Sequence, residues 1–120
     1  METRAFRIKL KPDSIDRVRE WAAEIMRRRD EALETMRDET VALECFFLER
    51  AADGDYLIGV MTAESFERSQ QAVRESVHAI DAYHQQFKRD TWESVEPLEL
   101  LVDLNRLAEL TRASPTPGGT

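Results

Sequence analysis

The sequence predicts an α+β fold of the ferredoxin-like type, with its elements in the order β-α-β-β-α-β. Two runs of alternating apolar residues flank the dipeptide Asp53-Gly54, which is typical of an antiparallel hairpin. Stretches with helical periodicity precede and follow this hairpin, and a further alternating run stands near each end of the domain. A four-stranded antiparallel sheet with the helices on one face accommodates this order.

A single domain accounts for most of the 120 residues. We expect it to cover residues 1–110, and we expect residues 111–120, which are rich in Pro and Gly, to form a disordered tail. The net charge of −7 disfavours binding to a phosphate backbone, and the single cysteine, Cys45, excludes an internal disulfide. Because no apolar run is long enough for a membrane span or a signal-peptide core, we expect a cytoplasmic location.

The first strand is predicted at residues 4–10, where apolar and charged side chains alternate. Residues 11–14 contain a proline and a serine, which end the strand and cap a following helix. From residue 15 onward, apolar positions recur every three or four residues. This spacing predicts one long helix that ends near Asp38. The apolar face of the strand consists of Phe6, Ile8 and Leu10.

The central hairpin is predicted to have a four-residue loop at residues 51–54. A loop of this length pairs Phe47 with Ile58 and Cys45 with Val60. Because paired residues share a face, their apolar side chains coincide, and we expect this face to be the buried one. Cys45 is then expected to be a small core residue rather than a reactive thiol.

The second half of the domain begins with Thr62, which is expected to cap a helical stretch at residues 63–92 with a break near His78. The last strand is predicted at residues 98–104, where apolar residues alternate again. In this fold the last strand pairs with the first, which would bring acidic residues next to basic ones. The residues concerned are Glu99 and Asp103 on the last strand and Arg7 and Lys9 on the first.

The face of the sheet opposite the helices is predicted to be partly apolar. Large exposed apolar patches are rare on monomers. We therefore expect a homodimer in which two such open sheet faces pack against each other. The residues expected there are Phe46, Leu48, Leu57, Met61 and Leu101.

Three segments resemble a known group of proteins: residues 6–12, the hairpin around Asp53-Gly54, and residues 78–84. They resemble a family of small bacterial proteins of unknown function that is similar to the dimeric α/β-barrel superfamily. That superfamily includes cofactor-independent oxygenases, small-molecule isomerases and haem-binding enzymes. The resemblance implies a pocket between helices and sheet that binds or transforms a small organic molecule, by monooxygenase-like or isomerase-like chemistry. The alternative is a non-catalytic dimeric module without a pocket, so the sequence does not decide whether the protein is an enzyme.

The candidate catalytic residues are polar side chains on the helix faces that should cover the sheet. His84 can serve as a general base, a proton shuttle or an axial haem ligand, or it can complete the core through a hydrogen bond. Arg29 can bind a carboxylate or phenolate oxygen, or it can extend past the sheet edge and pair with a carboxylate. Tyr83 is expected to border the same pocket. The candidate substrate-binding residues are His78, Asp81 and Trp92.

Metals and nucleic acids are not expected as ligands. His78 and His84 lie about 120° apart on a continuous helix, so they do not converge with Asp81 on one ion. We expect no cofactor, with haem as the alternative. The basic run at residues 27–29 is surrounded by acidic residues, and the predicted sheet has no aromatic platform for stacking RNA bases.

Overall fold

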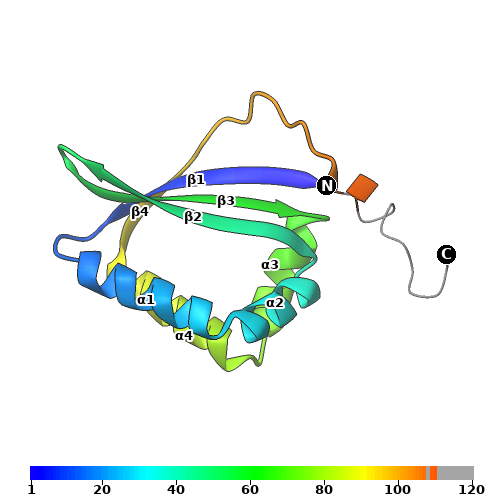
Figure 1. Ribbon diagram of the computed structural model, residues 1–120, viewed down its shortest axis with the longest axis horizontal. Coiled ribbons are helices and arrows are strands. Elements are labelled where there is room, and N and C mark those ends of the chain that lie inside the picture. Colours follow the sequence, from blue (N-terminus) through cyan, green and yellow to red (C-terminus); the bar gives the residue numbers. More distant parts are fainter. Residues whose placement is uncertain (108, 111–120) are drawn as a thin grey trace.

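The computed structural model describes residues 1–107, 109 and 110 (Figure 1), and the predicted tail at 111–120 lies outside these residues. The chain alternates between strands and pairs of helices, in the order predicted for a ferredoxin-like fold. The elements are β1 (Glu2–Leu10), α1 (Ile15–Arg27), α2 (Arg29–Asp38), β2 (Val41–Ala51), β3 (Gly54–Ala63), α3 (Phe66–Glu75), α4 (Ala79–Thr91) and β4 (Trp92–Pro97).

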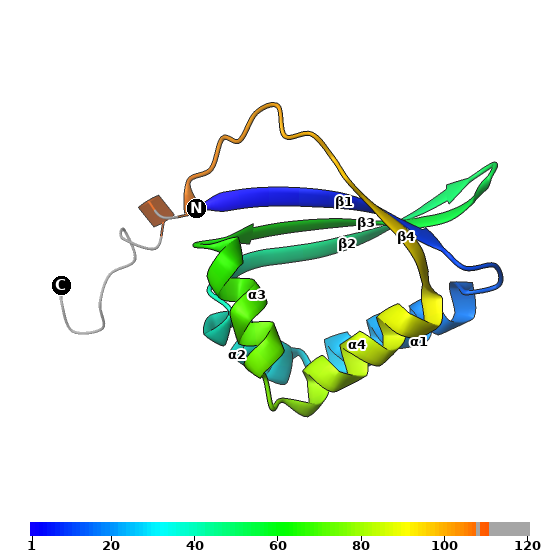
Figure 2. The same ribbon diagram turned by 180° about the vertical axis from the view of Figure 1, so that it is seen from behind.

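The four strands form one antiparallel sheet in the order β2-β3-β1-β4. Opposite views show all four labelled helices on the same side of this sheet (Figures 1 and 2). The α+β, ferredoxin-like fold class is therefore confirmed. The helical stretch after the hairpin divides at residues 76–78, as predicted near His78. The helix before the hairpin was predicted to be continuous, but it is interrupted at Arg28.

The register of the hairpin agrees with the prediction, with Phe47 opposite Ile58 and Cys45 opposite Val60. Ala51 pairs directly with Gly54, whose φ of 143° is one that residues with a side chain rarely adopt. The turn between β2 and β3 is thus tighter than the predicted loop. The pairing of side chains is unaffected.

The predicted orientation of the hairpin was wrong: its two faces are exchanged. Leu57 is only 2% exposed and lies in the core, whereas Phe47 is 59% exposed on the face away from the helices. The reason is the pairing with β1, which places Leu57 opposite Ile8 and Gly59 opposite Phe6. Cross-strand partners share a face, so β1 determines which side of the hairpin is buried.

This exchange also corrects the residues expected at the open sheet face. Of that set, Phe46, Leu48 and Leu57 pack in the core beneath the helices, and Met61 packs against a smaller cluster around Phe66. The open face carries other apolar residues instead. They are Leu43 and Phe47, which are exposed, and Cys45, Ile58 and Val60, which are half-buried.

The main core lies between the sheet and the α1–α4 pair. Trp21 of α1 stacks on Phe87 of α4, with ring centroids 4.3 Å apart, and meets the edge of Phe46 from β2 at 5.2 Å. Phe46 fits there because it crosses Gly59, where an added Cβ would lie only 3.1 Å from its ring. These aromatic contacts tie both helices to the sheet.

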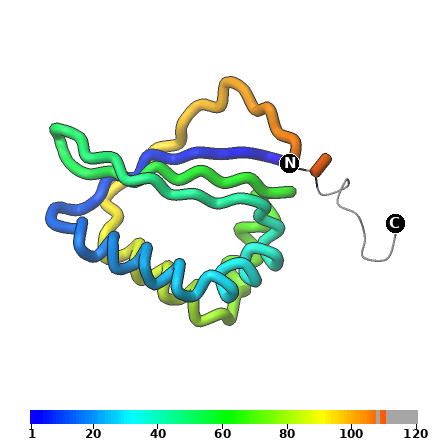
Figure 3. Tube along the Cα trace, viewed as in Figure 1, coloured from blue at the N-terminus to red at the C-terminus, as the bar shows by residue number. Residues whose placement is uncertain are grey.

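The last strand is shorter and earlier than predicted. β4 begins at Trp92 directly after α4, and its end is marked by the backbone hydrogen bond from Leu98 N to Ala5 O. The segment at residues 98–106, which includes the strand predicted at 98–104, leaves the sheet and arches over the face opposite the helices (Figure 3). Because α4 is anchored at its end by the bond from Lys11 N to Thr91 O, pairing with β1 starts at once. Glu96, rather than Glu99, lies opposite Arg7.

Candidate functional site between the sheet and the helices

His84 lies on α4 within the aromatic core. The ring centroids of Trp21, Phe46, Phe87 and Trp92 are 5.6, 6.1, 6.2 and 6.5 Å from its imidazole centroid. Trp21 and Phe87 stack roughly parallel to the imidazole, whereas the other two rings meet it edge-on. The imidazole is therefore held in a fixed orientation by walls from α1, α4, β2 and β4.

One hydrogen bond defines the tautomer of His84. The indole Nε1–H of Trp21 donates to His84 Nδ1 at 3.1 Å, so the imidazole proton is on Nε2. Burial, together with the positive charge of Lys88, lowers the pKa of His84 to about 3. His84 is thus neutral at physiological pH and presents an N–H donor rather than a free basic nitrogen.

The Nε2 atom of His84 has no hydrogen-bond partner among the described residues. It is also not one of the fully enclosed polar atoms without a partner, which in this part of the chain are Thr40 Oγ1 and Trp92 Nε1. The donor therefore borders space that solvent reaches. A ligand oxygen in that space could accept its proton.

Lys88 lies one helical turn beyond His84, on the same side of α4. Its Nζ is 4.9 Å from the ring centroid of Trp92, and no carboxylate among the described residues lies within 4.0 Å of it. Burial lowers the pKa of Lys88, while the negative charges of Glu44, Glu39 and Asp81 oppose this effect. This amine is near the core without a direct ion-pair partner.

Two carboxyl groups face Lys88 from other elements. Glu44 alternates with Phe46 on β2, so it lies on the helix-facing side of the sheet; it keeps access to solvent. Loss of hydration nevertheless raises the pKa of Glu44, and it raises the pKa of Glu39 at the end of α2 to about 7, with Asp81 contributing next. Since Lys88 and Glu44 are both shifted toward their neutral forms, burial outweighs their attraction.

His78 and Asp81 belong to a separate hollow of about 280 Å³ at the junction of α2, α3 and α4. His78 Nε2 lies 2.8 Å from Asp38 Oδ2, and this hydrogen bond raises the pKa of His78. Asp81 accepts a hydrogen bond from Ser76 just before α4 begins. Both residues thus connect helices. Glu39 also lines this hollow and links it electrostatically to Glu44 and Lys88.

Arg29 does not border the site, contrary to expectation. It is exposed at the start of α2, whereas the preceding residue, Arg28, is half-buried, with its Cζ 6.0 Å from the ring centroid of Tyr83. The interruption at Arg28 turns the helix and changes which residue faces inward. Tyr83 is half-buried and its hydroxyl accepts a hydrogen bond from Arg17 Nη1 at 3.3 Å, which ties α4 to α1.

The sequence analysis named two of the residues that the structure brings together, His84 and Trp92, and missed Lys88 and Glu44. The spacing of four residues between His84 and Lys88 is a signal that could have found the lysine. Glu44 could be identified only if the prediction had assigned the buried face of the hairpin correctly. Among the described residues, no group of three His, Cys, Asp or Glu side chains is arranged to hold a metal ion.

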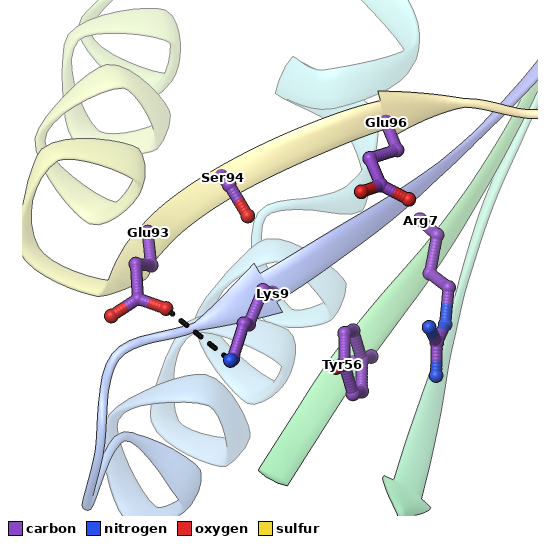
Figure 4. A pocket seen from close by; sticks show the side chains of 6 residues that line it. All are labelled: Arg7, Lys9, Tyr56, Glu93, Ser94 and Glu96. Carbon is purple, nitrogen blue, oxygen red and sulfur yellow. Dashed lines mark ion pairs between the residues drawn. The ribbon is translucent and has the colours of Figure 1, made fainter. Parts of the chain in front are cut away.

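A second hollow, of about 340 Å³, lies on the open sheet face between β1, β3 and β4 (Figure 4). Its two basic side chains are paired within the protein. Arg7 Nε lies 2.9 Å from Glu49 Oε1 and its guanidinium carbon 3.6 Å from the Tyr56 ring centroid, while Lys9 forms an ion pair with Glu93 at 3.8 Å. Both basic groups already have partners, and the charged lining residue without an ion pair to a described residue is an acid, Glu96, so the hollow presents no unpaired cation to an anionic ligand.

Comparisons with known proteins add a family and a fold. A family model matches residues 1–109 and is described as a family of unknown function (DUF6176). No curated protein matches the chain. Among solved structures, protein Atu4242 from Agrobacterium tumefaciens is similar with a TM-score of 0.54 and 13% identity, over 82% of this chain and 89% of that chain. Rv0793 from Mycobacterium tuberculosis has a TM-score of 0.48 and 18% identity, over 86% and 97%. The similarity to Atu4242 supports the fold alone.

In the described part of the chain, no helix is long and apolar enough to cross a membrane.

Proposed function

Because the chain belongs to a family of unknown function (DUF6176), which brings no activity with it, we propose a function from the site itself: the protein binds a small organic carbonyl compound or its enolate beside His84. The observation that carries this proposal is the neutral imidazole with its Nε2–H unpartnered at the border of accessible space. A buried donor gains most from an acceptor that replaces water, and a carbonyl or enolate oxygen supplies one.

The walls of the site favour a flat, largely apolar ligand. Trp21, Phe46 and Trp92 surround the imidazole with aromatic surface. Pockets that bind small molecules typically combine such surface with a few polar groups that fix the orientation. Here those groups are the His84 donor and the amine of Lys88, which favour an oxygen that carries negative charge.

Of the two reaction types implied by the resemblance, isomerisation by proton transfer fits these groups better than oxygenation. A carboxylate, at Glu44 or Glu39, would remove a proton from the carbon next to the carbonyl group. The electron pair of the broken C–H bond would form a C=C bond, and the π electrons of the C=O bond would move to the oxygen, where His84 Nε2–H donates to the developing enolate. The carboxylic acid would then return the proton to another carbon. The raised pKa values of both carboxyl groups place them nearer neutral pH, where a carboxylate can take up a proton and release it again.

The test uses the fluorescence of the two tryptophans, both of which border the site. Titration with a panel of phenols and aryl ketones should quench the wild type, and His84→Phe should lose this binding. Because His84→Phe leaves Trp21 without its acceptor, its stability is checked by thermal unfolding. Gln86→Leu, an exposed position on the same helix, is the matched control and should bind like the wild type. Unchanged binding by folded His84→Phe would place the ligand elsewhere and refute the proposal.

The second candidate function is a non-catalytic homodimeric module, and it is favoured by the open sheet face. Leu43 and Phe47 are 40% and 59% exposed there, and Leu101 and Leu104 in the segment arching over this face are 81% and 92% exposed. We propose that a second copy of the chain covers these residues. Sedimentation should show a dimer at micromolar concentration that Phe47→Asp dissociates. A monomeric wild type at high micromolar concentration would contradict it.

A further inference from the structure

Lysine is rare in this protein, and one of its lysines is inside the candidate site. The chain has 17 basic residues, but only three of them are lysines: Lys9, Lys11 and Lys88. Arginine therefore supplies most of the positive charge. Lysine differs from arginine in one chemical respect, because its amine can lose its proton and become a nucleophile.

The environment of Lys88 differs from that of the other two lysines. Lys9 pairs with Glu93 and is 40% exposed, and Lys11 donates to the backbone oxygen of Arg89 at the surface. Lys88 is half-buried, has no hydrogen bond and no ion pair within the described residues, and packs against the face of Trp92. The charged groups that face it from other elements are Glu44 and Glu39, and Asp81 and neutral His84 lie on its own helix.

Groups suitable for carbonyl condensation surround this amine. His84, one turn away, offers a neutral Nε2–H that can hydrogen-bond to the oxygen of a carbonyl group. Burial raises the pKa of Glu44, and it raises that of Glu39 to about 7; both shifts favour the carboxylic acid form, which can protonate a departing hydroxyl group. Burial lowers the pKa of Lys88, which favours the neutral amine with its lone pair over the ammonium form.

We propose that the Nζ of Lys88 forms an imine with a small aldehyde or ketone bound beside His84, a reaction that deepens the proposed function and rests on it. The lone pair of the neutral amine attacks the carbonyl carbon, and the π electrons of the C=O bond move to its oxygen. A proton passes from nitrogen to oxygen, giving a carbinolamine. Protonation of its hydroxyl group releases water and leaves the iminium ion, which activates the neighbouring carbon for loss of a proton. Hydrolysis by water returns the free amine.

The experiment traps this iminium ion by reduction. The folded wild type is treated at neutral pH with benzaldehyde and sodium cyanoborohydride, and the benzylated lysines are located by peptide mass mapping. Lys88 should be modified several-fold faster than Lys9 and Lys11, which serve as controls within the same chain. In denaturing urea this preference should disappear, because it arises from the folded environment and not from neighbouring sequence.

The other outcomes separate this inference from the proposed function. A wild type whose tryptophans are quenched by aryl ketones, but whose Lys88 reacts no faster than Lys9 and Lys11, overturns imine formation and leaves binding at His84 intact. A wild type that shows neither quenching nor preferential labelling overturns both. Lys88→Arg keeps a positive charge without the nucleophile: it should remain folded and lose the fast-reacting position, with Lys9 and Lys11 modified as slowly as in the wild type. If fast modification persists elsewhere in Lys88→Arg, the amine was assigned wrongly.

Discussion

Two regions of this protein contain the same kinds of groups but use them in opposite ways. On the open sheet face, Arg7 and Lys9 each contact a carboxylate, and Tyr56 donates a hydrogen bond to Asp53 at 2.7 Å. Between sheet and helices, the donor of His84 and the amine of Lys88 have no such partners among the described residues. The basic side chains of the open-face hollow are paired, whereas the donor and the amine near the core are not.

This difference indicates which region of the molecule can hold a ligand. Paired charges at a surface contribute little to stability and leave nothing free for a ligand. A polar group near a core lowers stability unless it forms a hydrogen bond. A donor there without a protein partner therefore bonds either to water or to a bound molecule. The hollow on the open face is the larger of the two we describe, yet the chemistry favours the region around His84.

The largest expected effect contrasts an aromatic residue from each region. Phe87 is fully buried against Trp21, so Phe87→Ala should lower the free energy of unfolding by about 3–5 kcal/mol. Phe47 is 59% exposed, so Phe47→Ala should cost less than about 1 kcal/mol at concentrations where the chain is monomeric. Urea denaturation of both variants measures the two values. Equal losses in the free energy of unfolding would show that Phe47 is buried, and therefore that the hairpin turns the face carrying Phe47 toward the core.

A smaller effect, on pH dependence, has opposite signs in the two regions. The pKa of Glu39 is raised by burial to about 7, so the folded state binds more protons than the unfolded state and loses stability as pH rises from about 4.5 to 7. Glu39→Gln should remove that loss, on the order of 1 kcal/mol after allowance for solvent screening. The hydrogen bond from Tyr56 lowers the pKa of Asp53. Ionised Asp53 therefore stabilises the folded state above its unfolded pKa, and this stabilisation is lost as the pH falls.

Thermal unfolding of both variants across this pH range gives the comparison. Relative to the wild type, Glu39→Gln should gain stability as pH rises, whereas Asp53→Asn should lose most at neutral pH and least in acid. In the wild type, His84 changes stability with pH in the opposite direction to Glu39. The lowered pKa of His84 makes stability fall as the pH decreases from about 6.5. Because His84 is present in the wild type and in both variants, subtracting the wild-type stability from that of each variant removes the contribution of His84. Parallel curves for both variants would contradict the assignment of Glu39 to the interior.

The success and failure of the sequence analysis have physical causes in particular residues. The order of the elements and the register of the hairpin follow from periodicity, and both were predicted. The buried side of the hairpin was not, because apolar residues occupy both of its faces: Phe46 and Leu57 on one, Phe47 and Ile58 on the other. Only β1 distinguishes them, because Phe6 and Ile8 lie on one of its faces and Arg7 and Lys9 on the other, and that distinction depends on a long-range pairing.

The predictions of the last strand and of Arg29 were wrong for a different reason. The run at residues 98–104 has the alternation of a strand, but β4 had already formed from Trp92 onward, where the periodicity is weak. At Arg28 the backbone leaves the helical conformation, with φ of −102° and ψ of 33°, which moved the inward position by one residue. Neither proline nor glycine marks this interruption, so local propensity did not indicate it. His84 was found because one polar residue in an apolar stripe is conspicuous.

The smallest expected effect comes from the open face and completes the contrast. Arg7 is bonded to Glu49 and lies over Tyr56, and its side chain is 33% exposed. Because exposed ion pairs contribute little and are screened by salt, Arg7→Gln should leave the midpoint of thermal unfolding nearly unchanged, with any difference vanishing at high ionic strength. It should also leave the quenching by aryl ketones unchanged, because the hollow on the open sheet face is not the proposed ligand site. A loss of ligand binding in Arg7→Gln would reverse the comparison and assign the site to the open face. A loss confined to His84→Phe would show that the unpartnered donor near the core, and not the larger hollow with paired basic side chains, recognises the ligand.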